Sequence, residues 1–89
     1  MIGTVDGVNN ANTGGISAGM NATAVIESSV VNGTVTNSRA GGKVGAIVSY
    51  SVAGAKIISC TATGQIGIGS DMRDITAADF DASGLATIE

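Results

Sequence analysis

The sequence predicts an all-β fold: a β-solenoid of about three rungs, each rung being one turn of short stacked strands. Three observations predict it. Segments about 31 residues apart resemble one another, apolar residues recur at every second position, and the apolar content is Val, Ile and Ala with only 2% aromatic residues. The 14 Gly and the absence of Pro favour short strands joined by tight corners.

The internal repeat fixes the expected stacking. Gly-Thr-Val at residues 33–35 returns as Gly-Gln-Ile at 64–66, 31 residues later (64 − 33), and Gly-Thr-Val at 3–5 precedes it by 30 (33 − 3). Residues 26–35 align over 57–66 without a gap. We therefore expect these segments to lie on one another in successive rungs.

The N-terminal half predicts two strands and two corners. A short strand is expected over residues 2–8, followed by a loop over 9–15, because Asn and Gly favour turns. The next strand covers 24–36, where Val25, Val31 and Val35 share one face and Glu27 interrupts it. A corner is expected over 37–42.

The next two segments show the clearest alternation, which indicates one buried and one solvated face. Residues 44–52 and 58–68 each form one predicted strand, and Gly54 supplies the corner between them. The residues predicted to point inward are those at even positions, namely Val44, Ala46, Val48, Tyr50, Val52, Ile58, Cys60, Ala62, Gly64, Ile66 and Ile68.

The pattern fades after residue 69, and acidic residues gather. A single helical turn is expected after Thr76, its N-cap, and a short last strand over 84–88. We expect one domain over residues 1–89, with repeats over 1–69 and an acidic, cap-like segment over 70–89. Four aspartates of this segment are the candidate protein contact surface: Asp71, Asp74, Asp79 and Asp81.

Residues 42–45 (Gly-Lys-Val-Gly) and 57–66 (Ile-Ile-Ser-Cys-Thr-Ala-Thr-Gly-Gln-Ile) resemble the GLUG repeat of large bacterial surface proteins. About one full repeat matches, with departures at Lys43, Ser59 and Thr61, where that family has Leu, Asn and Tyr. The resemblance implies a right-handed parallel β-helix or related β-solenoid that serves as a stalk, spacer or adhesive surface. The matching positions are structural. The resemblance implies corners at Gly42, Gly45 and Gly64 and interior positions at Val44, Cys60 and Ile66.

Composition argues against several classes of function. Four basic residues against seven acidic ones give a net charge of −3 and no basic face for nucleic acid. No window approaches the roughly 18 apolar residues of a membrane span, and the first residues do not resemble a signal peptide. The sequence starts and stops inside a repeat, as a fragment of a larger protein would, and for such a fragment we expect the cell surface or the outside of the cell.

No catalytic, cofactor-binding or metal-binding residue is predicted, so we expect a protein that is not an enzyme. With no His and one Cys, the common nucleophilic and zinc sites are missing. Cys60 is expected to be a small buried hydrophobe. The four aspartates lack the spacing of a calcium loop, which favours a solvated acidic cap. A threonine array is not expected, because the repeat places Thr34 over Gln65.

The predicted function is structural or adhesive, with weak multivalent contact to protein or glycan surfaces and self-association into a homo-oligomer. The alternative is a small phage-borne or bacterial protein that inhibits a host factor through its acidic C-terminal segment. A third possibility, a self-assembling filament or decoration subunit, shares the fold and differs in assembly.

Overall fold

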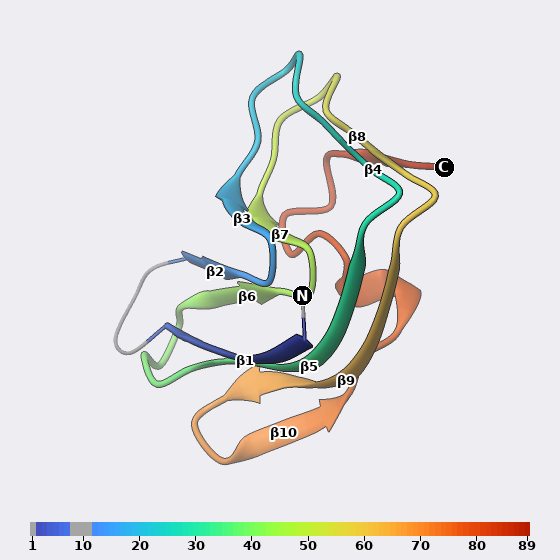
Figure 1. The fold of residues 1–89 in the computed structure, drawn as a ribbon. Helices are drawn as coiled ribbons and strands as arrows, with labels where there is room; N and C mark the ends of the chain where they lie inside the picture. Colours follow the sequence, from blue (N-terminus) through green and yellow to red (C-terminus); the bar gives the residue numbers. More distant parts are fainter. Residues whose placement is uncertain (1, 8–11) are drawn as a thin grey trace.

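The computed structural model describes residues 2–7 and 12–89, and this part of the chain contains strands, one short 3-10 helix (η1) and no α-helix (Figure 1). The elements are β1 (Ile2–Gly7), β2 (Asn12–Gly14), β3 (Ser17–Gly19), β4 (Val25–Glu27), β5 (Val30–Asn37), β6 (Lys43–Gly45), β7 (Val48–Tyr50), β8 (Lys56–Ile58), β9 (Thr61–Ile68), β10 (Asp71–Asp74), η1 (Ala77–Asp79) and β11 (Thr87–Ile88). The all-β prediction is confirmed.

The strands form four small sheets, none of them closed. One sheet has the order β1-β5-β9-β10, a second the order β11-β8-β4, and two pairs, β2-β6 and β3-β7, complete the set. Every pairing is parallel except that of β10 with β9. Strands from distant parts of the chain therefore run side by side, as β1, β5 and β9 do in Figure 1.

The strand register coincides with the alignment read from the sequence. Gly3 lies opposite Gly33, and Gly33 lies opposite Gly64. The other parallel pairs have the same spacing, for example Val25 with Lys56. Thr34 lies opposite Gln65, as the repeat predicts.

Aliphatic side chains form columns across the parallel strands. Val5 pairs with Val35 and Val35 with Ile66, and Val31 pairs with Ala62. Val35 and Val31 are fully buried, and Ile66 is 1% exposed. Burying a side chain of this size contributes about 1.5–3 kcal/mol relative to leaving it exposed. The inward positions predicted for residues 62 and 66 are confirmed.

Two corners reverse which face points inward, and the predicted strands 24–36 and 58–68 are each two strands. Ser28 (φ 51°) separates β4 from β5, and Ser59 (φ 53°) separates β8 from β9. Val25, predicted inside, is therefore 52% exposed, whereas Ile57 is fully buried. Because Ser59 makes this corner, Gly64 is not at a corner but in the middle of β9.

The predicted strand 44–52 is also divided, and the predicted alternation does not hold in its second half. The chain bends at residues 46–47 between β6 and β7. Past this bend Val48 is fully buried as predicted, but Ser49 and Ser51 are fully buried too and Tyr50 is 52% exposed, so the inward position is confirmed for residue 48 and wrong for residue 50. The Ser49 hydroxyl donates to Asn12 Oδ1 at 3.1 Å, which satisfies its buried polar group.

The remaining predictions are confirmed in part. The expected loop over 9–15 is partly wrong, since residues 12–14 form β2; residues 8–11 lie outside the described residues. Gly54 (φ 104°) does make the turn before β8. The last strand, β11, is shorter than the predicted 84–88.

Candidate functional site

The C-terminal segment, residues 70–89, runs back past β9, β7 and β8 and carries the four predicted aspartates (Figure 1). β10 pairs antiparallel with β9. The backbone then runs along residues 46–49, where the Ala46 N–H donates to the Asp79 carbonyl at 2.7 Å, and β11 finally pairs in parallel with β8. The segment thus contacts β9, the bend before β7, and β8 in turn.

Asp71 and Asp74 lie at the two ends of β10 and are exposed. Asp71 pairs across the ladder with Ile68, and Asp74 pairs with Gln65. The Gln65 side-chain amide donates to Asp74 Oδ1 at 2.6 Å. Both carboxylates remain accessible to a partner.

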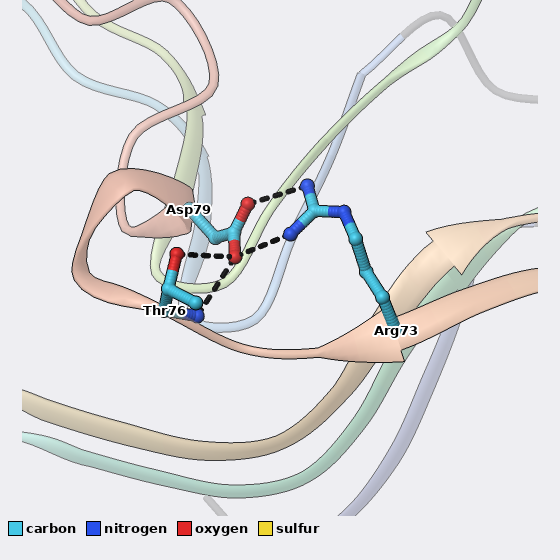
Figure 2. A network of polar contacts seen from close by, with 3 residues as sticks. All are labelled: Arg73, Thr76 and Asp79. Carbon is cyan, nitrogen blue, oxygen red and sulfur yellow. Dashed lines mark hydrogen bonds and ion pairs between the residues drawn. The ribbon is translucent and has the colours of Figure 1, made fainter.

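Asp79 has a different environment. It is 7% exposed, and its carboxylate receives two hydrogen-bonding groups of Arg73, with Nη2 at 2.5 Å from Oδ1 and Nη1 at 2.6 Å from Oδ2 (Figure 2). The backbone N–H of Thr76 donates to Oδ2 at 2.8 Å, and its hydroxyl does so at 3.1 Å. The Arg73 hydrogen bond, helped by those of Thr76 and opposed by burial, lowers the pKa of Asp79.

The predicted N-cap explains part of this geometry. Thr76 precedes the single turn η1, and Asp79, three residues on, closes a capping box with it. The helical turn and its Thr76 N-cap are thus confirmed, as a 3-10 helix. The contact with Arg73 was not predicted, since it depends on how β10 lies beside η1.

Asp81 is 4% exposed and holds a second polar cluster. The Ser51 hydroxyl donates to Oδ2, the Ser83 hydroxyl donates to Oδ1 at 2.8 Å, and the Ala86 N–H donates to Oδ2 at 2.9 Å. Burial acts to raise the pKa of Asp81, but these hydrogen bonds outweigh it and the pKa is lowered. Sequence reasoning missed Ser51 because no pattern linked it to an aspartate 30 residues away, and it also missed the local contact of Ser83, two residues after Asp81.

The four aspartates therefore do not form one surface. Asp71 and Asp74 face solvent, whereas Asp79 and Asp81 are engaged within the protein, because each has enough donors to offset its desolvation. A contact surface on this segment would depend on the two aspartates of β10.

The arrangement offers little chemistry. Among residues 2–7 and 12–89 no group of three or more His, Cys, Asp or Glu side chains could hold a metal ion. Ser51 and Asp81 are in contact, but Ser51 is fully buried and the sequence has no His to serve as a general base between them. A substrate could not reach this hydroxyl.

A small pocket of about 200 Å³ lies beside β10. Its lining residues are Val44, Ile66, Gly67, Ile68, Asp71 and Arg73. It is smaller than the roughly 300–1,000 Å³ of most ligand pockets, and the Arg73 guanidinium is already paired with Asp79.

Cys60 is half-buried rather than fully enclosed, and it packs against the core. Its Sγ lies 3.4 Å from the Ile58 carbonyl oxygen and 3.5 Å from that of Ile26. This is the environment of a small packing residue with weak sulfur hydrogen bonds.

The outward side of β1, β5 and β9, here called the outer face, is polar. Its exposed polar side chains are Thr4, Asp6, Asn32, Thr61, Thr63 and Gln65, and Val30 is exposed among them. The Thr63 hydroxyl donates to Asn32 Oδ1 at 3.4 Å, so neighbouring strands place small donors and acceptors side by side.

No family model, no curated protein and no solved structure matches the chain. Within the described ranges, no helix has the length and apolar character needed to cross a membrane.

Proposed function

We propose that the chain is a short β-solenoid and serves as a structural or adhesive segment of a bacterial surface protein. The observation that carries the proposal is the shared spacing of the parallel pairs. β1, β2, β3 and β4 each pair with a strand 30 or 31 residues further on, and β5 pairs with β9 at 31. A chain that returns to the same place at a constant interval winds in stacked turns.

The positions that resemble the GLUG repeat support the same proposal. Most of them fall on β6, β8 and β9, with Gly42, Ser59 and Cys60 beside these strands, and Ile66 lies in the buried column with Val35. Gly45 is buried, and a Cβ there would lie 1.8 Å from the Val48 carbonyl oxygen, so this position needs Gly for close packing. These residues serve packing, as a spacer or stalk requires.

The outer face supports the adhesive part of the proposal. Thr, Asn and Gln side chains each offer a donor and an acceptor without a net charge. One such hydrogen bond contributes little to binding, because it replaces hydrogen bonds that both groups already make to water. Many copies at a surface would give useful avidity, provided that they can bind together.

Bead binding at two surface densities tests this function. The chain is coupled at low and at high density, and retention on glycan-coated and protein-coated surfaces is measured. We expect retention at high density only. Replacing outer-face residues, Thr63→Ala with Gln65→Ala, should reduce it, whereas Thr87→Ala, on exposed β11, should not. Density-independent binding of one soluble protein in a 1:1 complex would contradict the proposal.

One observation favours the second candidate, an inhibitor that binds a host protein through its acidic C-terminal segment. Arg73, between Asp71 and Asp74 on β10, is paired with Asp79. Its positive charge is balanced by Asp79, so the two exposed carboxylates of β10 leave this surface with a net negative charge. A basic partner surface would fit it.

This candidate has its own matched test. The double substitution Asp71→Asn with Asp74→Asn should weaken capture of a basic partner at least tenfold, and Asp6→Asn with Glu27→Gln, the same charge change at exposed positions of β1 and β4, should not. Equal behaviour of the two variants would dismiss the acidic contact surface.

A further inference from the structure

We propose that the C-terminal segment is an autoinhibitory cap: residues 70–89 occupy the edge on which the N-terminal edge of a second copy would otherwise stack. The inference rests on the proposed stacked fold and adds to it a reason why the stack ends. Its occupant is a second copy of this chain, placed head to tail.

A column of glycines gives the first observation. Gly33 (φ 156°) and Gly64 (φ 123°) lie on the strand before them so closely that a Cβ would come within 1.8 Å of the Gly3 and Gly33 carbonyl oxygens. Gly3 has nearly the same φ as Gly64, 121°, yet none of the described residues lies within 4 Å of where its Cβ would be. Gly3 thus has the conformation of a stacked glycine, and within residues 2–7 and 12–89 it has no strand stacked beneath it.

The other end of this column is occupied. The Gly3 carbonyl of β1 lies under Gly33 of β5, and the Gly33 carbonyl lies under Gly64 of β9. The Gly64 carbonyl instead accepts a hydrogen bond from the Ile75 N–H at 2.9 Å. Ile75 belongs to the C-terminal segment. The segment therefore occupies the place that Gly3 of a second copy would take.

The remaining strands continue the match. β1, β2, β3 and β4 each lie at one edge of their sheet. In a head-to-tail stack they would lie on β9, β6, β7 and β8 with the registers already present inside the chain, where β1 lies on β5 and β4 on β8. The intramolecular sheets would continue into the next copy without a new kind of contact.

The seated segment blocks this continuation. β10 runs antiparallel to β9 and presents Asp71, Arg73 and Asp74 at the edge, and charged residues on an edge strand discourage further pairing. The backbone from Asp79 to Ser83 meanwhile covers the bend and β7, where Ala82 N–H donates to the Val48 carbonyl at 3.1 Å.

Within the segment, Asp79 joins η1 to β10 through Arg73. Asp81 joins the segment to the rest of the protein, through Ser51 beyond β7. The Ser51 and Ser83 hydroxyl oxygens lie 2.7 Å apart. Because these positions are so close, cysteines placed there could fix the segment to the strands by a disulfide and release it on reduction.

The test is the variant Ser51→Cys with Ser83→Cys, in which Cys60→Ala leaves these two thiols alone. Oxidation should join them, since the pair is near enough for a disulfide. Reduction should free the segment, because Ser51 no longer donates to Asp81. Sedimentation velocity gives the mass of each form, and hydrogen exchange at the Ile75 and Ala46 amides reports whether the segment is seated.

We expect the oxidised protein to keep a constant mass, and the reduced protein to at least double its average mass over about a hundredfold rise in concentration. Adding Gly3→Ala should abolish that growth, because its Cβ would meet the Gly64 carbonyl of the next copy. Three results would overturn the proposal: growth of the oxidised form, growth that survives Gly3→Ala, or a reduced form that stays monomeric. A reduced monomer with protected amides is included in the third result, because the contacts of Ser51 with Asp81 would then not be what holds the segment in place.

This experiment is independent of bead binding. A chain that adheres in many copies but never stacks would support the proposed function and contradict the capping role of residues 70–89. A chain that stacks but does not adhere would support the capping role and contradict the adhesive function.

Discussion

Gly3 and Gly64 form a matched pair that tests the stacking of strands. Their φ angles are 121° and 123°, so alanine at either position bears similar backbone strain, about 1–3 kcal/mol. Their surroundings differ. A Cβ at Gly3 meets nothing within 4 Å, whereas a Cβ at Gly64 would lie 1.8 Å from the Gly33 carbonyl oxygen and 3.0 Å from its nitrogen.

The difference between the two variants is therefore the free energy of the clash. Backbone cannot move aside as a flexible side chain would, so Gly64→Ala must shift β9 away from β5. Overpacking of this kind costs about 1–3 kcal/mol, and contact with backbone places it near the upper end. We expect Gly64→Ala to lose about 3 kcal/mol more unfolding free energy than Gly3→Ala.

Urea unfolding monitored by circular dichroism measures both variants. With a slope of about 1 kcal/mol/M for a small domain, the two midpoints should differ by about 2–3 M. Gly41→Ala serves as a control, because Gly41 has a positive φ of 79° in a turn with open space around it. Equal losses for Gly3→Ala and Gly64→Ala would refute the glycine column and the β5–β9 register with it.

Three single residues provide further predictions. Asp79→Asn should destabilise the protein at neutral pH. Since the pKa of Asp79 in the folded protein lies below its ordinary value of 3.8, the wild type keeps this stability above that pH and loses it as the pH falls further. Thermal melts of both proteins from pH 7 to 2 would measure this, and a pH-independent difference would count against the ion pair with Arg73. Ser59→Asn should raise unfolding free energy by up to about 1 kcal/mol, because Asn adopts the left-handed conformation more readily; a loss of stability in urea would contradict the corner geometry. The Cys60 thiol should react with a maleimide several-fold more slowly in the folded protein than in urea, and equal rates would show that it is not packed against the core.

Local patterns determined much of the fold. The β class is implied by the Val, Ile and Gly content, and the pairing of Gly33 with Gly64 could be read by aligning the sequence with itself. Within β9 the inward positions of Ala62 and Ile66 could also be predicted from the alternation of side chains along a strand, whereas Gly64, predicted inward by the same rule, is exposed. The Gly54 turn needed only a residue that accepts positive φ.

The tertiary structure decided the corners and the C-terminal end. Ser28 and Ser59 have positive φ angles that could not be predicted from their residue type, and each of these corners reverses the inward face of the next strand. Alternation therefore placed Ile66 correctly and Tyr50 incorrectly. The burial of Asp79 and Asp81 also escaped prediction, because an acidic residue is expected at the surface until the fold brings donors such as Arg73 and Ser51 to it. Sequence periodicity thus determined the interval between paired strands, and contacts between distant residues decided which side chains the core encloses.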